Sequence, residues 1–288
     1  MAGLLERHIA AITGSGSGIG RAIALGYARE GAQVIALDMN GDTAAETAAA
    51  IGRAIALGYA REGAQVIALD MNGETVAETA AAIGRAGGKA RSFVLDVRER
   101  DRCREIAAQV EKEVGPISIL VNDAGINRRN AFTADPEAVI KDWEDVLATN
   151  LYGVFNVTHA FLGQLRATKG RVVNIGSIQS FMHVRTPNSP AYTSSKHGVL
   201  GFTRALAAEL GKDGVRVNAI GPGFIETPLN EKVRATNPDL VRIFHEHTPL
   251  GRAGKPEDIV GPAIFLASDL SSFVTGSIVM ADGGYRVI

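Results

Sequence analysis

A glycine-rich turn between an apolar run and a helix-forming stretch places the strongest constraint on the fold. Residues 9–12, Ile-Ala-Ala-Ile, suit a buried parallel strand, and the turn at 13–20 reads Thr-Gly-Ser-Gly-Ser-Gly-Ile-Gly. Glycines here allow a tight turn and let a pyrophosphate approach the backbone N–H groups at the start of a helix. The order of strand, glycine turn and helix therefore predicts the first crossover of a nucleotide-binding α/β fold.

The next predicted strand ends on a carboxylate. Residues 33–37 form an apolar run that closes on Asp38, 18 residues beyond Gly20. A carboxylate at this place can accept hydrogen bonds from the ribose hydroxyls of the adenosine and would repel a 2′-phosphate. Because the glycine turn contains no Arg or Lys, we predict NAD(H) in preference to NADP(H).

One segment of the chain occurs twice. Residues 51–82 repeat residues 19–50 with 30 of 32 positions identical. A solenoid needs about three or more units, so two near-identical copies in a chain that does not otherwise repeat indicate a tandem duplication. Asp70 is the counterpart of Asp38, and we favour Asp38 for the ribose because a short crossover leads to it from the first helix.

The repeated helix–strand unit has two possible fates. It either bulges from the sheet or adds a strand, which would move the strand before Asp96 outward by about 4.8 Å. We favour the bulge because a long surface insertion costs little closure entropy.

The remaining pattern alternates strands and helices. Apolar runs predict strands at residues 92–97, 117–121, 171–175, 215–220 and 279–282. Helical patterns cover residues 102–114, 143–165, 195–210 and 256–266. This alternation predicts a Rossmann-type doubly wound parallel sheet in a single domain over residues 1–288. The segment 224–255, which contains three prolines, is expected to cover a substrate pocket.

Composition excludes several classes of partner. The chain has 30 basic and 31 acidic residues, a net charge of −1 that argues against nucleic acid or an anionic membrane as the main partner. Cys103 is the one cysteine, so no intramolecular disulfide can form. No stretch approaches the roughly 18 apolar residues of a spanning helix. We expect a cytoplasmic protein that binds a small molecule, without a metal, since His245-Glu246-His247 has no further ligands around it in the sequence.

A phenol and an ammonium stand four residues apart, at Tyr192 and Lys196. On a helix these side chains share a face. A nearby ammonium favours phenolate and would lower the tyrosine pKa from about 10 toward the working pH. Tyr192 is therefore a candidate acid for the alkoxide that hydride transfer produces, and a candidate base for the reverse oxidation.

Taken together, the motifs resemble the short-chain dehydrogenase/reductase family over the chain from about Arg7 to Gly284. The motifs, in order, are the turn at 13–20, Asn-Asp-Ala-Gly at 122–125, Asn150, Ser177, Tyr192 with Lys196, and Gly-Pro-Gly at 221–223. The family often has Asn where this chain has Asp123, and the distance from Ser177 to Tyr192 is about two residues longer than usual.

The resemblance implies a role for four residues in the reaction. Tyr192 would be the acid/base, and Lys196 would lower its pKa and hold the nicotinamide ribose. Ser177 would bond the substrate oxygen. Asn150 would help hold a water that relays protons to Lys196.

The resemblance also implies the cofactor site and the assembly. The pyrophosphate end would meet Gly14, Ser17, Gly18 and Ile19. The adenine would meet Asp96 and Val97, and the channel would be lined by Asn122, Ala124 and Gly125. The nicotinamide would lie along Pro222, Gly223, Ile225 and Thr227. The segment 273–280 resembles the family's subunit contact, which implies a homotetramer.

The substrate is expected to be a sugar acid or a polyol. Residues 126–129 and 177–180 look like the sugar-acid branch of the family, such as gluconate 5-dehydrogenase and 2-deoxy-gluconate-type dehydrogenases. The paired arginines at 128–129 could grip a carboxylate, and we assign Arg128, Ser177 and Gln179 to the substrate. The alternatives are a 3-oxoacyl-type carbonyl reductase and a catalytically silent, cofactor-binding relative disabled by the duplication.

Overall fold

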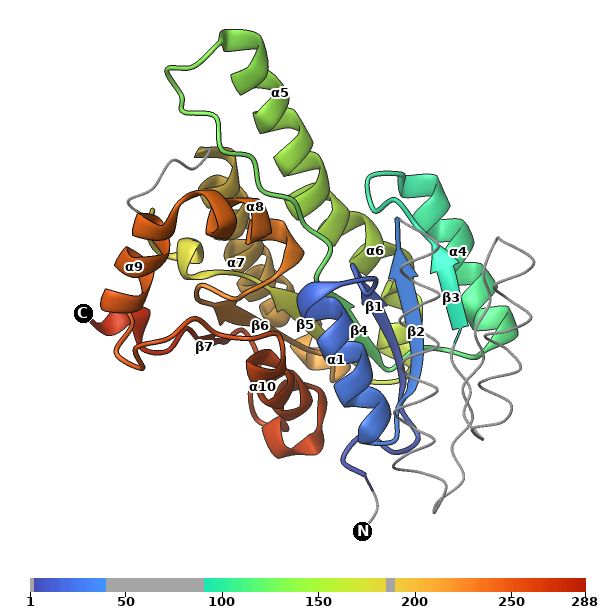
Figure 1. Cartoon of the computed structure of the whole chain (residues 1–288). Coiled ribbons are helices and arrows are strands. Elements are labelled where there is room, and N and C mark those ends of the chain that lie inside the picture. Colours follow the sequence, from blue (N-terminus) through green and yellow to red (C-terminus); the bar gives the residue numbers. More distant parts are fainter. Residues whose placement is uncertain (1–2, 40–90, 185–189) are drawn as a thin grey trace, which may run out of the picture.

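A single parallel sheet forms the centre of the molecule (Figure 1). The computed structural model describes residues 3–39, 91–184 and 190–288. Within these ranges the sheet has seven strands in the order β3-β2-β1-β4-β5-β6-β7. The strands are β1 (Ile9–Thr13), β2 (Gln33–Asp38), β3 (Arg91–Val94), β4 (Ile119–Asn122), β5 (Arg171–Ile175), β6 (Arg216–Pro222) and β7 (Ile278–Ala281). The predicted α/β fold with a doubly wound parallel sheet is confirmed.

The order of the strands places a crevice beside β1. The chain builds outward from β1 through β2 to β3, returns to the other side of β1 with β4, and continues to β7. Ligands of open α/β sheets bind at such a switch point, outside the carboxyl ends of the strands. The glycine turn follows β1 at this edge.

Helices cover both faces of the sheet (Figure 1). The helices are α1 (Gly18–Arg29), α4 (Arg100–Glu113), α5 (Pro136–Leu147), α6 (Gly153–Ala167), α7 (Pro190–Leu210), α8 (Pro228–Thr236), α9 (Pro238–Glu246) and α10 (Glu257–Ala267). One apolar core lies between the sheet and the α1–α10 pair, which the Tyr27 hydroxyl fastens by donating to the Ala263 carbonyl at 3.0 Å. The other core joins α4, α6 and α7 to the opposite face.

The strand of the first copy occupies the place next to β1. β2 pairs with β1 on one side and with β3 on the other, where Asp38 lies opposite Val94. No strand therefore separates β2 from β3, so the alternative in which an added strand displaces the segment before Asp96 does not apply at this place. The second copy at 51–82, with Asp70, lies outside the described residues.

Two predicted helices differ in extent from the observed ones. The segment expected as one helix over 143–165 is split between α5 and α6 by a π-helical turn, Ala148–Tyr152. α7 begins at Pro190 rather than at 195, which puts Tyr192 and Lys196 in its first two turns. Proline favours such a start because the first helical turn leaves its N–H groups without intrahelical partners. Among the described residues, no helix combines the length and apolar character needed to cross a membrane.

Candidate active site

A cavity of about 530 Å³ lies at the carboxyl edge of the sheet, where the switch point was expected. The glycine turn, the ends of β4 to β6, the start of α7 and the segment after β6 all contribute to its wall. The predicted site residues that line it are Gly14, Ser17, Gly18, Ile19, Asp96, Val97, Ala124, Gly125, Arg128, Ser177, Gln179, Tyr192, Lys196, Pro222, Gly223, Ile225 and Thr227. One continuous space thus joins the glycine turn to the Tyr192 region.

Close backbone contact shapes the glycine turn. Gly14 has φ +66°, and a Cβ there would lie 2.9 Å from the backbone nitrogen and Cα of Ala124. Only glycine relieves both restrictions. The Thr13 hydroxyl oxygen accepts hydrogen bonds from the backbone N–H groups of Asp123, at 3.1 Å, and Ala124, at 3.2 Å. These contacts tie the start of the crossover to the segment after β4.

The catalytic candidates converge from two elements. Ser177 follows β5, and its hydroxyl oxygen accepts from the backbone N–H of Gln179 at 3.1 Å. The side chain of Tyr192 on α7 lies near that of Ser177, which acts to lower the pKa of the phenol. The Lys196 ammonium donates to the Ile175 carbonyl at 2.7 Å and lies over the Tyr192 ring, 5.6 Å from its centroid.

The protonation of these groups differs from the expectation. Burial raises the pKa of Tyr192 to about 12, and the charge of Asp123 acts in the same direction, whereas Ser177 and the charge of Arg129 oppose it. Burial also lowers the pKa of Lys196 to about 8, against the charge of Asp123. The expected lowering of the phenol pKa by Lys196 is therefore wrong for this state, because the ammonium faces the ring and burial dominates.

Asn122 lies behind the cavity wall rather than along it. Its amide group donates to Thr158 at 3.0 Å and to Asn174 at 2.8 Å. Asn174 in turn donates to Thr203 of α7 at 2.9 Å. The expected channel-lining role does not match this placement, because the Asn122 side chain points toward the helix layer of α6 and α7.

Asn150 is also absent from the cavity wall. Its side chain connects two segments that do form the wall. It lies in the π-helical turn, where its amide group exchanges hydrogen bonds with the main chain of Ile126, at 2.8 and 2.9 Å. The same amide donates to the Ser195 hydroxyl at 3.2 Å. Asn150 thus connects the segment after β4 to the helix that carries Tyr192.

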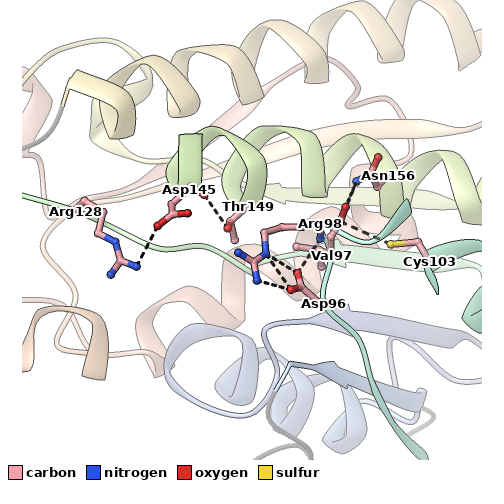
Figure 2. Close-up of polar contacts among 8 residues, drawn as sticks. All are labelled: Asp96, Val97, Arg98, Cys103, Arg128, Asp145, Thr149 and Asn156. Atoms are coloured by element: carbon pink, nitrogen blue, oxygen red, sulfur yellow. Dashed lines mark hydrogen bonds and ion pairs between the residues drawn. The ribbon is translucent and has the colours of Figure 1, made fainter. Parts of the chain in front are cut away.

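The two adjacent arginines have different surroundings. Arg128 has an exposed side chain and forms an ion pair with Asp145 at 3.7 Å (Figure 2). Arg129 is partly buried, lines the same cavity, and acts electrostatically on Tyr192. Within the described part of the chain it forms no hydrogen bond or ion pair, which leaves its guanidinium available to a ligand.

Sequence reasoning missed several lining residues. Arg98, Asp123 and Met39 adjoin predicted positions and line the cavity, and their place next to Val97, Asn122 and Asp38 was the available signal. Leu240 and Phe244 of α9 also line it, so the segment 224–255 does reach the cavity. The side chain of Asp38 lies outside the described set.

The fold and the site define a class of oxidoreductase. The short chain dehydrogenase model matches residues 8–51, and the model described as enoyl-(acyl carrier protein) reductase matches residues 45–286. The chain belongs to the short-chain dehydrogenase/reductase family, and it is an oxidoreductase acting on CH–OH groups.

Individual relatives cover nearly the whole chain. A 3-oxoacyl-(acyl-carrier-protein) reductase of Thermotoga maritima is 40% identical over 97% of this chain and 98% of its own length. A gluconate 5-dehydrogenase of Gluconobacter oxydans is 36% identical over 96% and 94%. A crystal structure of a gluconate 5-dehydrogenase from Burkholderia cenocepacia, in complex with NADP and tartrate, has a TM-score of 0.81 at 32% identity, covering 99% of this chain and 97% of that one.

The buried ammonium predicts a pH-dependent stability. Because the pKa of Lys196 falls from 10.5 to about 8 on folding, the unfolded chain holds more protons between these values. The buried Lys196 ammonium therefore lowers the free energy of unfolding most below about pH 8, and this destabilisation is lost as the pH rises from about 8 to 10.5. We expect the stability of Lys196→Met relative to wild type to decline from pH 8 to pH 10.5 in denaturant unfolding. The exposed Lys112→Met on α4 is the control, and parallel pH profiles for Lys196→Met and wild type would contradict the assignment.

Proposed function

We propose that the chain is a nicotinamide-dependent oxidoreductase that interconverts a secondary alcohol and a ketone, with Tyr192 as the acid/base. The observation that carries this proposal is the continuous cavity from the glycine turn to Ser177, Tyr192 and Lys196. A dinucleotide site and a proton donor in one space are what such a reaction requires.

The residues present fit a dinucleotide. Ser17 is the N-cap of α1 and Gly18 its first residue, where free backbone N–H groups can meet a pyrophosphate. Gly14 lies in the turn before them and lines the same cavity. Val97 would contribute to the adenosine end, and the nicotinamide end would contact residues 222–227. When bound, the nicotinamide supplies or accepts the hydride.

The chain's own residues manage one proton and the substrate oxygen. In the reductive direction Tyr192 holds its proton at neutral pH, since its pKa is raised, and donates it to the oxygen of the former carbonyl. Ser177 bonds the same oxygen, since the two side chains lie near each other. Lys196 contributes its charge and holds the ribose. Both polar side-chain atoms of Asn150 are engaged, so a water relay to Lys196 would use its main-chain carbonyl.

Removing the phenol hydroxyl tests the reaction. We expect Tyr192→Phe to lower kcat by roughly 100-fold or more, the scale of general acid–base catalysis, while NADH binding stays intact. Tyr152→Phe, on the exposed π-helical turn, is the matched control. Full turnover in Tyr192→Phe would refute the proposal, and NADH binding by wild type with no turnover of any alcohol or ketone would favour the catalytically silent relative.

For the cofactor we propose NAD(H) in preference to NADP(H), with Asp38 at the ribose. The support is the position of Asp38 at the end of the strand beside β1 and the absence of basic residues from the glycine turn. The Burkholderia relative was solved with NADP, so this preference would be a property of the present chain.

The repeat bears on the same question. We propose that it arose by tandem duplication, and the two family models support this, since one match ends at residue 51 and the other begins at residue 45, close to the boundary between the copies. The second copy would then be dispensable, because β2 of the first copy already pairs with β3.

Deleting residues 51–82 removes Asp70 and keeps Asp38. We expect the shortened chain to bind NADH with the wild-type preference over NADPH, as measured by fluorescence titration. In the full chain Asp38→Ala should reduce that preference, and Asp70→Ala should not. Loss of NADH binding on deletion, or a changed preference in Asp70→Ala, would contradict the assignment.

For the substrate we propose a sugar acid, or a related polyol, with the carboxylate held by Arg129 rather than by Arg128. Arg129 lines the cavity and interacts electrostatically with Tyr192, whereas Arg128 forms an ion pair with Asp145. Gln179 also lines this region and accepts from Thr193 at 2.7 Å. The gluconate 5-dehydrogenase relatives agree with this class. The second candidate, a 3-oxoacyl reductase, is favoured by the Thermotoga relative.

A comparison of substrates tests the role of Arg129. We expect Arg129→Ala to raise KM for a keto sugar acid roughly tenfold or more, the scale of a lost charge-assisted hydrogen bond, with a smaller effect on a neutral ketose. Arg129→Lys keeps the charge but loses the bidentate fork. Arg128→Ala should leave KM for both substrates unchanged. Equal effects of Arg129→Ala on both substrates would contradict the carboxylate role, and preferred use of a 3-oxoacyl thioester would favour the second candidate.

We also propose a cytoplasmic homotetramer that associates through residues 273–280. Phe273 has a fully exposed side chain in the single chain, which suits a subunit contact. A monomeric mass in light scattering would refute the assembly.

A further inference from the structure

The side chain of Gln179 is buried and yet forms part of the cavity wall. The residue is 6% exposed and lines the same space as Ser177 and Tyr192. It belongs to the short 3₁₀ turn Ile178–Ser180, which hydrogen bonds hold at both ends. The Ser177 Oγ accepts from the backbone N–H of Gln179 at 3.1 Å, and the Ser180 hydroxyl accepts from the backbone N–H of Ser177 at 3.2 Å. The backbone that carries this amide is therefore fixed.

The carbonyl end of the Gln179 amide is already engaged by α7. The Thr193 hydroxyl donates to the Gln179 Oε1 at 2.7 Å, the usual length of an O–H···O hydrogen bond. The Thr193 Oγ1 also lies 2.9 Å from Nδ1 of His183. A hydroxyl has one hydrogen. Since Thr193 gives that hydrogen to Gln179, it accepts from Nδ1 of His183, and a directed chain runs from His183 through Thr193 to Gln179.

The nitrogen end of the same amide has no such partner. A glutamine amide combines an acceptor oxygen with an NH2 group that has two donors. Among the residues that the structure describes, no group accepts from the Gln179 Nε2. A buried donor without an acceptor is unfavourable. The cavity wall therefore presents an NH2 group, held in one orientation, that a ligand can satisfy.

The place of Gln179 determines which part of a ligand its amide can meet. Its own backbone N–H holds the Ser177 hydroxyl oxygen, and its side chain is held by the residue that follows Tyr192. The proposed substrate carbonyl meets both Ser177 and Tyr192. The amide thus lies beside the reacting carbon rather than at the far end of the substrate. In a sugar-derived substrate, the nearest further acceptor is the oxygen on the carbon next to the carbonyl.

We propose that Gln179 is a specificity-determining residue that donates from Nε2 to an oxygen on the carbon next to the substrate carbonyl. Thr193 is the positioning residue, because its hydroxyl keeps Oε1 turned away from the substrate, and His183 supports Thr193. This inference deepens the proposed function and rests on it. A donor at this place accepts any oxygen there, including that of an ether, whereas an amide carbonyl would require a hydroxyl.

Four small neutral ketones distinguish these cases. Hydroxyacetone has an OH where butanone has a methyl group, and methoxyacetone has an ether oxygen where 2-pentanone has a CH2 group. The preference within each pair is the ratio of the two kcat/KM values with NADH, or of the inhibition constants for a ketone that binds without turnover. Because the oxygen also activates the carbonyl, each preference is compared between wild type and variants rather than taken by itself.

We expect Gln179→Leu to lower the preference for the oxygen-bearing ketone in both pairs about tenfold, the scale of one hydrogen bond. Gln179→Glu presents acceptors alone, so it should lower the preference for methoxyacetone as much and spare hydroxyacetone, whose hydroxyl can donate to the carboxylate. Thr193→Val should lower both preferences, and Thr193→Ser, which keeps the hydroxyl, should retain them. Gln109→Leu makes the same change on the exposed face of α4 and should alter neither preference.

Other patterns would overturn the assignment. Unchanged preferences in Gln179→Leu would refute the role of Gln179, and a loss confined to hydroxyacetone would show that the amide accepts rather than donates. Unchanged preferences in Thr193→Val, or their loss in Thr193→Ser, would contradict positioning by the Thr193 hydroxyl. If wild type with NADH or NADPH reduced neither these ketones nor a keto sugar acid, the proposed function itself would fail, and this role with it.

Discussion

The close approach of two backbone segments beside β1 is the constraint on which the site depends. Gly14 lies against Ala124 where a Cβ would come within 2.9 Å of two backbone atoms, and the Thr13 hydroxyl holds both N–H groups that follow β4. This contact joins the first crossover to the central strand of the second half-sheet. Because both segments line the cavity, their separation sets the width of the space in which a dinucleotide would lie.

The catalytic end depends on a different balance, between burial and charge. Tyr192 and Lys196 are both buried, which raises the pKa of the phenol and lowers that of the ammonium. Each group is thus held closer to its neutral form than it would be in water, a state that favours a proton donor over a phenolate. Asn150 supports this arrangement from behind, through its bonds to Ile126 and Ser195.

Patterns along the chain predicted the parts that depend on local spacing. The strands, the glycine turn and many members of the cavity wall follow from apolar runs, glycines and motif order. The sequence could not reveal which way a residue points at a strand end, so Asn122 was expected in the channel although it contacts Thr158 and Asn174. Residues 123–130 belong to no helix or strand, so no periodicity assigns a direction to either side chain, and for this reason Arg128 and Arg129 could not be distinguished.

Other differences arise from three-dimensional contacts. Helical spacing places Tyr192 and Lys196 on one face, but it does not say whether the ammonium meets the hydroxyl or the ring, and the structure has it over the ring. Likewise Arg98 is two residues from Asp96, and only the conformation of the chain beyond β3 brings the guanidinium onto the carboxylate.

The central claim is that one cavity brings a nicotinamide and the substrate oxygen to Tyr192. Transfer of an isotope tests it most directly: NADH that carries deuterium at both positions of the nicotinamide C4 is incubated with a keto sugar acid, and the product is analysed by mass spectrometry and NMR. The account predicts one deuterium on the new carbinol carbon and none elsewhere. Product that forms without the label, or a label at another carbon, would contradict it.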